Sequence, residues 1–168
     1  RSRGLGDVYK RQDSIWAFII KNYYKPLFLR ERKFDFLIGN PPWLTYKGIA
    51  DPDYQSFVKD LIVNVYGLAR GGRARVAELV THMEQATLFM LRCAEFYLHE
   101  GHRIAFVMPR SVFSADHHEA FRRHTYVPRA KLKLQRIFDL EEIEPLFGMP
   151  ACAVVAKKGE QTAYPVPC

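Results

Sequence analysis

Cysteine is scarce in this sequence and long apolar runs are absent. The three cysteines, Cys93, Cys152 and Cys168, form no CxxC pair and are odd in number. The sequence therefore indicates neither a zinc cluster nor a disulfide framework. No apolar run approaches the roughly 18 to 20 residues that a membrane helix needs, and the longest candidates are short stretches such as 104–108. We expect a protein of the reducing cytoplasm that does not span a membrane.

The residues that are present are sufficient for a folded core. The 168 residues are 48% hydrophobic and 14% aromatic, and a chain of this length buries about two thirds of its unfolded surface. This composition excludes intrinsic disorder as a description of the whole chain. The formal net charge of +7 favours an anionic partner.

The two ends of the chain differ from its middle. Residues 1–12, RSRGLGDVYKRQ, show no apolar periodicity and resemble a translated adaptor sequence, which is set aside in reasoning about the fold. We therefore expect a non-native segment over 1–12, a folded domain over 13–160 and a truncated tail over 161–168.

Apolar spacing predicts helices alternating with strands. A helix is expected from Asp13 or Ser14 to Tyr23, with Pro26 either ending it or beginning a linker, and a long helix over 78–100, ended by Gly101. The stripe of the long helix is Leu79, Met83, Ala86, Met90, Cys93 and Tyr97. Shorter helices are expected over 53–65 and 116–124, and strands over 33–39, 103–108, 132–139 and 151–157. This order predicts an α/β fold. The last two strands lack room for a crossover helix, so we expect them to pair antiparallel.

The segment Asn40-Pro41-Pro42-Trp43 directly follows the first predicted strand. Ligands of open α/β sheets gather at the carboxyl ends of strands. The two prolines stiffen the loop and remove backbone donors, which leaves carbonyl oxygens to accept hydrogen bonds. The Asn40 side chain adds an acceptor, and the Trp43 indole can stack on a planar ring. Such a set fits a planar substrate with an amino group. The alternative is a turn that ends the strand, with Trp43 in the core.

These residues resemble the NPP(Y/F/W) motif of amino-group DNA methyltransferases, especially the adenine-specific enzymes of restriction-modification systems. The resemblance covers about residues 33–158 and is specific only at Asn40–Trp43. It implies the C-terminal half of a Rossmann-like, three-layer methyltransferase domain that ends in an antiparallel strand pair. The implied reaction transfers a methyl group from S-adenosylmethionine to the exocyclic amine of an adenine flipped out of double-stranded DNA.

The resemblance also assigns roles to single residues. Asn40 and the Pro41 carbonyl would accept the protons of the amine, Pro42 would hold the loop, and Trp43 would stack on the base. Phe147, in the segment Leu146–Pro150, would form another wall of the pocket or belong to the core. Arg110 and Ser111 would line the pocket or touch phosphate, although a plain surface role for Arg110 is equally open.

Two further features bear on binding. The run Arg122, Arg123, Arg129, Lys131, Lys133 and Arg136 contains no acid and fits either phosphate contacts or a solvated face. The adjacent residues His117 and His118 would point about 100° apart on a helix, so no metal site is predicted.

The glycine-rich turn that the family uses for S-adenosylmethionine is expected upstream of this chain, so no cofactor-binding residue is assigned. The missing N-terminal half, a target-recognition domain and a nuclease are possible partners, and the chain on its own is expected to be inactive. Two alternatives stay open: a methyltransferase acting on RNA or on protein glutamine, and a non-catalytic nucleic-acid-binding module of the same fold.

Overall fold

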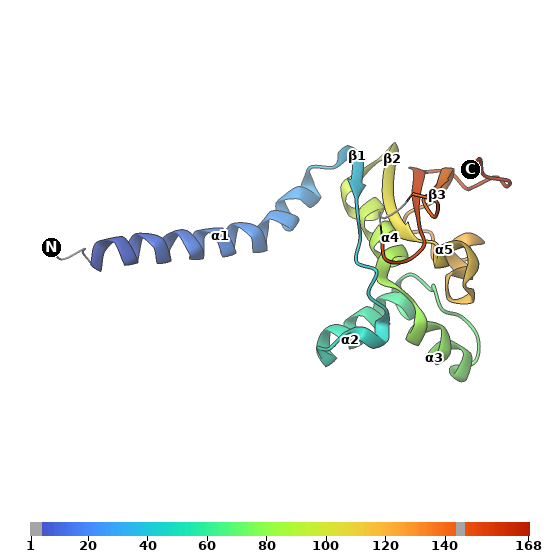
Figure 1. Cartoon of the computed structure of the whole chain (residues 1–168), viewed down its shortest axis with the longest axis horizontal. Coiled ribbons are helices and arrows are strands. Elements are labelled where there is room, and N and C mark those ends of the chain that lie inside the picture. The colour runs from blue at the N-terminus through green and yellow to red at the C-terminus, as the bar shows by residue number, and fades with distance from the viewer. Residues whose placement is uncertain (1–4, 144–146) are drawn as a thin grey trace. The chain divides into compact units, whose positions relative to one another are not determined.

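The computed structural model (Figure 1) describes residues 5–143 and 147–168, with side chains from residue 18 onward. The chain divides into two compact units, Arg1–Lys33 and Phe34–Cys168. Residues 1–4 of the expected adaptor segment and Leu146 lie outside the described residues. No helix in the described part is long and apolar enough to cross a membrane.

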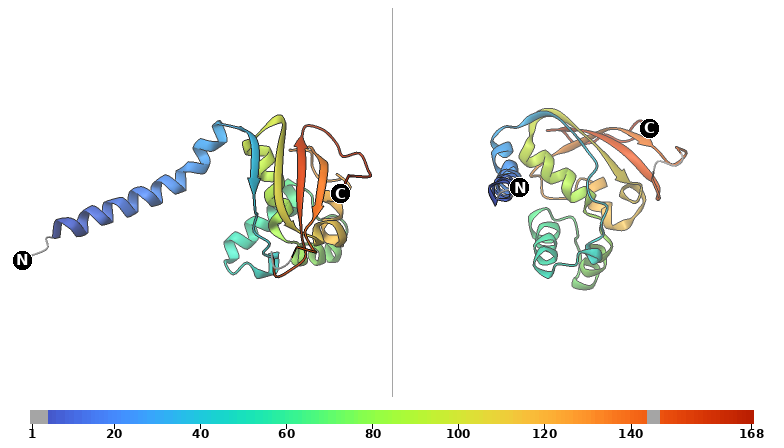
Figure 2. Two further views of the ribbon diagram at one scale, coloured as in Figure 1. Left: turned by 45° about the horizontal axis from the view of Figure 1, so that its top comes forward. Right: turned by 60° about the vertical axis from the view of Figure 1, so that its left-hand side comes forward.

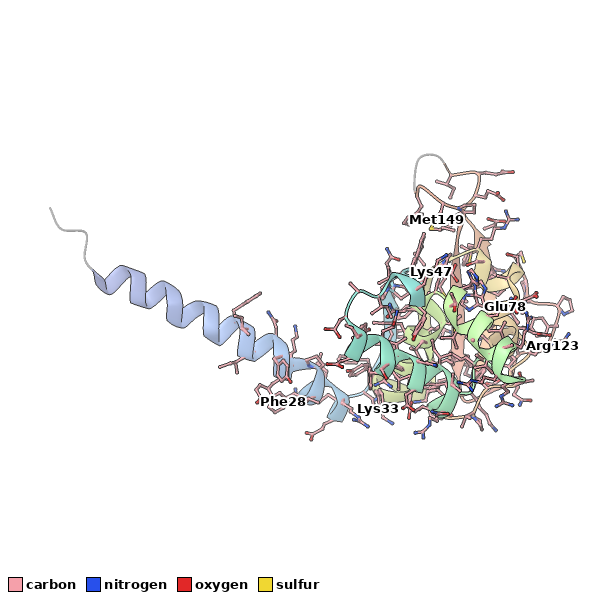
Figure 3. All side chains as sticks on the ribbon, turned by 90° about the horizontal axis from the view of Figure 1, so that it is seen from below. Phe28, Lys33, Lys47, Glu78, Arg123 and Met149 are labelled. Carbon is pink, nitrogen blue, oxygen red and sulfur yellow. The ribbon has the colours of Figure 1, made fainter. Side chains whose placement is uncertain are left out.

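The first unit is the helix α1, Leu5–Glu31. The helix continues through Pro26, so the predicted end at this proline is wrong. Pro26 removes the hydrogen bond to the carbonyl of Asn22. The described side chains of α1 are almost all exposed, as Phe28 illustrates (Figure 3), so water can satisfy that carbonyl in place of the missing donor.

The second unit is built on a four-stranded sheet of order β1-β2-β4-β3. Its strands are β1 Phe34–Gly39, β2 Leu98–Pro109, β3 Leu132–Asp139 and β4 Ala151–Lys158. β1 and β2 are parallel, whereas β4 runs antiparallel to both β2 and β3. The predicted α/β class and the terminal antiparallel pair are confirmed.

The helices of this unit connect the strands. Between β1 and β2 lie η1 Tyr46–Gly48, α2 Pro52–Asp60, the π-helical turn η2 Leu61–Val65, α3 Arg73–His82 and α4 Gln85–Tyr97. Between β2 and β3 lie α5 Ser111–Ser114, η3 Asp116–His118 and α6 Glu119–Arg122. The short helices predicted over 53–65 and 116–124 are thus confirmed in outline.

The single helix predicted over 78–100 is wrong. It is broken between α3 and α4 because Met83 and Glu84 are extended, and the Glu84 backbone forms an isolated bridge with Thr45. Its predicted end at Gly101 lies within β2, where this glycine adopts a φ of 81°. The apolar side chains of Met83, Ala86 and Met90 enter one core. Their spacing along the sequence therefore continues across the break and resembles that of a single helix.

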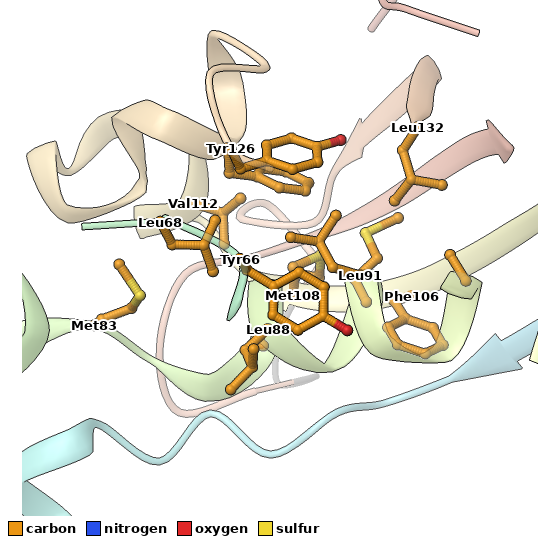
Figure 4. Packing of buried hydrophobic residues seen from close by; sticks show 14 of the residues in the cluster. Tyr66, Leu68, Met83, Leu88, Leu91, Phe106, Met108, Val112, Tyr126 and Leu132 are labelled. Carbon is orange, nitrogen blue, oxygen red and sulfur yellow. The ribbon is translucent and has the colours of Figure 1, made fainter. Parts of the chain in front are cut away.

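The helices of the second unit lie on one face of the sheet (Figure 2, right). Ile104, Phe106 and Met108 of β2 point into the core on that face, and Tyr66, Leu88 and Leu91 pack beside them (Figure 4). Residues 34–143 and 147–168 therefore form two layers, and the third layer that the resemblance implies for the whole domain stays a prediction. The connections explain the two layers, since both helical segments enter the same core and the described residues of the β3–β4 connection, 140–143 and 147–150, contain no helix.

The opposite face of the sheet is apolar at the β1 edge. Phe36 is 64% exposed and Ile38 is 86% exposed. Their register partners are Arg103 and Ala105 of β2. Within the described part of this unit, β1 is an edge strand with large apolar side chains in contact with solvent.

Candidate functional site

Three loops converge at the carboxyl ends of β1 and β2, which we call the carboxyl edge. The loop after Gly39 leaves β1 where Gly39 pairs with Phe106 of the parallel strand β2. Since β4 is antiparallel, its first residues lie at this same edge, and the Arg110 amide donates to the Pro150 carbonyl over 3.0 Å. The topology thus brings the segments 40–45, 109–111 and 147–150 together.

The motif at the end of β1 alternates between buried and exposed residues. Asn40 and Pro42 are exposed, whereas Pro41 is buried and Trp43 is half-buried. The buried Pro41 therefore anchors the loop while the Asn40 amide remains accessible to solvent. An exposed amide at the end of a parallel strand can accept hydrogen bonds from a ligand.

Trp43 is fixed from two sides. Its Nε1–H donates to the carbonyl of Val107 over 3.2 Å, and its indole lies against the ring of Phe147, with centroids 5.1 Å apart and planes tilted by 46°. Part of the indole also packs against the core. The structure therefore brings together two predicted site residues that are far apart in the sequence, and it leaves part of each ring exposed.

A small hollow adjoins this aromatic pair. It has a volume of about 220 Å³ and is lined by Leu140, Glu141, Ile143, Phe147, Gly148, Met149 and Pro150. Asn40 is not among its lining residues. In the described part of the chain, the hollow is thus connected to Trp43 through the ring of Phe147, and Asn40 lies outside it.

The other two predicted binding residues are engaged with carboxylates. Arg110 Nη2 lies 3.3 Å from Asp139 Oδ2, and the same guanidinium pairs with Glu141. Ser111 Oγ donates to Glu84 Oε1 over 2.8 Å. The charge of Arg110 is therefore compensated within the protein, and the Ser111 hydroxyl is directed at a buried carboxylate.

That carboxylate belongs to a cluster that sequence reasoning missed, which we call the Glu84 cluster: Glu84, Thr87, Ser111, His117 and His118. Glu84 Oε2 lies 2.8 Å from His117 Nε2 and 2.9 Å from His118 Nε2. Thr87 Oγ1 lies 3.2 Å from His118 Nδ1. The expectation that the two imidazoles diverge is wrong, because in the turn η3 both rings reach the same oxygen. Glu84 lies outside the predicted apolar stripe, so the spacing along the chain held no signal for its burial.

Burial and hydrogen bonding act in opposite directions on the cluster. Burial raises the pKa of Glu84, but the hydrogen bonds from His117, His118 and Ser111 outweigh it, and the net pKa lies well below its ordinary value. Burial lowers the pKa of His118, whose side chain is fully enclosed. The carboxylate is thus held ionised in the interior by its donors.

Most of the basic run is also paired internally. Arg122 Nη1 donates to the carbonyls of Val112 and Ala115. Arg123 pairs with Glu119, Arg129 with Glu95, and Lys133 with Glu160. Arg136 lies over the ring of Phe138. The structure therefore distributes these cations over several local contacts, and it does not gather them at the carboxyl edge.

Comparisons with known proteins return little. No family model matches the chain, and no curated protein matches it. One solved structure that it resembles is a chain of the type I R-M (restriction-modification) system, described for its complex assembly and conformational transition. The match has 13% identity and a TM-score of 0.43 over 77% of this chain, and our chain spans 22% of that neighbour. A likeness of this strength carries no argument about function.

Proposed function

We propose that the chain is the part of an adenine-specific DNA methyltransferase of a restriction-modification system that carries the catalytic loop. It would bind a flipped adenine of double-stranded DNA at the carboxyl edge and present its exocyclic amine for methylation. The observation that carries the proposal is the pairing of Trp43 with Phe147 beside the exposed Asn40. The arrangement supplies an acceptor and an aromatic surface at the end of a parallel strand.

The roles follow from the chemistry of the amine. The Asn40 side chain and the Pro41 carbonyl would each accept a hydrogen bond from one N–H of the amine. These bonds would stabilise the positive charge that develops on nitrogen during attack. Pro42 would restrict the loop. Trp43 and Phe147 would pack against the base, which offsets part of the few kcal/mol that flipping costs.

S-adenosylmethionine would supply the methyl group. The described residues ahead of β1 form the helix α1 and contain no glycine-rich turn after a strand, so they do not fit a cradle for this cofactor. We therefore derive no step through it. In our proposal a separate cofactor-binding half of the domain provides that cradle, and the apolar face at Phe36 and Ile38 is suited to packing against it. A target-recognition domain and a nuclease remain possible partners of the whole protein.

Binding of the base can be tested without the cofactor. A DNA duplex with 2-aminopurine at one position fluoresces more strongly when that base leaves the stack. We expect the 168-residue chain to raise this fluorescence and Trp43→Ala to abolish the increase. Phe57→Ala, which removes an exposed ring on α2, serves as the matched control and should leave the increase intact.

The outcomes separate the alternatives. An increase with duplex DNA that requires Trp43 supports the proposal. A response to labelled RNA but not to DNA would favour an RNA methyltransferase, and binding of a glutamine peptide would favour a protein methyltransferase. Duplex binding that is unaffected by Trp43→Ala would favour a non-catalytic nucleic-acid-binding module, and it would overturn the assigned role of the loop.

A further inference from the structure

The Glu84 cluster combines burial with a set of metal-ligating atoms. Among the described residues, one ligand atom each from Glu84, His117 and His118 lies within 4.8 Å of the other two. Glu84 is 8% exposed and His118 is 1% exposed. The three residues come from the start of α4 and from the turn η3, so only the tertiary structure assembles them.

We propose that Glu84, His117 and His118 bind a divalent transition metal, with zinc as the best fit. Two imidazole nitrogens and one carboxylate oxygen form a donor set that suits zinc. In tetrahedral coordination with bonds of about 2.0–2.1 Å, neighbouring ligand atoms lie about 3.3 Å apart. The two His Nε2–Glu84 Oε2 distances of 2.8 and 2.9 Å therefore need to widen by only about half an ångström.

The surroundings of the ligands suit both the metal-free and the metal-bound states. Without metal, His118 Nε2–H donates to Glu84, and Nδ1 accepts from the Thr87 hydroxyl. With metal on Nε2, the proton resides on Nδ1 and is donated to Thr87 Oγ1, because a hydroxyl both donates and accepts. Such a partner on the second ring nitrogen is usual for histidine ligands of metals. Ser111 likewise holds the second carboxylate oxygen of Glu84.

Metal binding at this site balances its protons. A neutral histidine moves its Nε2 proton to Nδ1, whereas an imidazolium releases the Nε2 proton to solvent. In both cases the lone pair on Nε2 forms a bond to the metal in place of the N–H···O bond to Glu84. The half-buried His117, with a side chain 16% exposed, leaves an approach for the ion and for a water as fourth ligand.

The proposed metal would stabilise the segments that lead into the carboxyl edge. The Glu84 backbone pairs with Thr45, two residues after Trp43, and the Glu84 side chain holds Ser111, next to Arg110. One ion would thus connect the loop after β1, the start of α4 and the segment after β2. This role is structural and does not depend on the function proposed above.

Titration with Co²⁺ tests the site directly. After removal of metals with a chelator, we expect the full chain to bind one Co²⁺ with the visible absorption of tetrahedral coordination, and Zn²⁺ to displace it. His117→Gln and Glu84→Gln should weaken binding at least tenfold. His102→Gln is the matched control, because His102 also lies beside a carboxylate, Asp35 at 3.4 Å, and beside a second imidazole, that of His99.

Zn²⁺ should also raise the Tm of the full chain by about 5 to 10 °C at a hundredfold excess over its Kd. Circular dichroism establishes that each variant is folded, and the half-buried His117→Gln decides the matter if Glu84→Gln unfolds. The absence of a 1:1 cobalt complex would overturn the proposal and leave a hydrogen-bonded cluster. Binding that persists in His117→Gln, or that His102→Gln weakens equally, would also overturn it. Because no DNA is present, these outcomes do not bear on the methyltransferase proposal.

Discussion

Lys158 terminates α4 from a neighbouring strand, and its removal provides a sharp test of the packing. The helix ends at Tyr97 without a glycine cap. Lys158 Nζ, on β4, donates to the carbonyls of Ala94 at 2.6 Å, Leu98 at 2.9 Å and Glu95 at 3.3 Å. The residue is 6% exposed. A buried cation thus satisfies the carbonyl end of the helix, where the macrodipole is negative.

Lys158→Met keeps the length of the side chain and removes its charge and donors. Loss of the interaction with the macrodipole costs up to about 2 kcal/mol, and the buried carbonyls left without a donor cost about 1–3 kcal/mol. Relief of the desolvated ammonium offsets part of this loss. We therefore expect the free energy of unfolding to fall by about 3 kcal/mol, or the Tm by about 6 to 12 °C.

Lys157→Met is the matched control at the next position. Lys157 Nζ pairs with Glu160 over 2.6 Å, and its side chain is 30% exposed. Partly exposed pairs of this kind contribute about 0.2–1 kcal/mol. Urea denaturation followed by circular dichroism measures both variants. A loss below about 1 kcal/mol for Lys158→Met, or equal losses for the two variants, would refute the assignment of Lys158 as the cap of α4.

Three further predictions concern titration, thiol reactivity and catalysis. Burial raises the pKa of Tyr126 to about 12, so the contribution of its neutral form to stability is complete below pH 10 and is lost as the pH rises towards 12. Tyr126→Phe should therefore make the free energy of unfolding fall less steeply with pH in this range, and an unchanged slope would contradict this. Cys168 is exposed whereas Cys152 is buried and its pKa is raised to about 12, so a thiol reagent should modify Cys168 in the native protein and Cys152 only on unfolding, with the order read by mass spectrometry. Labelled S-adenosylmethionine and unmethylated DNA should give no labelled base with this chain. In a protein that also contains the cofactor-binding half, Asn40→Ala should abolish the labelling. Labelling by the isolated chain, or full activity of the variant, would count against our assignments.

The strands and the candidate loop were predictable because their signals are local. Short runs rich in apolar residues predicted all four strands, of which the first two are stopped by glycine or proline, and the order of elements predicted the α/β class. The motif Asn40–Trp43 lies, as predicted, directly after β1. The chemistry assigned to Asn40, Trp43 and Phe147 stays a prediction, since their positions at one edge do not establish a reaction.

The helices were less predictable because tertiary contacts compete with periodicity. The break at Met83 and Glu84 depends on Thr45 and on the histidines of η3, which no local pattern of the helix reveals. Similarly, Pro26 removes one hydrogen bond and crowds the carbonyl one turn earlier, yet the exposed helix α1 continues through it.

By itself, the sequence determined the α/β class, the antiparallel final pair and the placement of Asn40–Trp43 at the end of a strand, because apolar period, proline and glycine act on neighbouring residues. Only the tertiary structure decided that Trp43 meets Phe147, that Arg110 and Ser111 face carboxylates, and that Glu84 gathers two histidines. These contacts depend on strand order and on which helix face enters the core. Both are fixed by the packing of distant segments, which spacing along the chain does not encode.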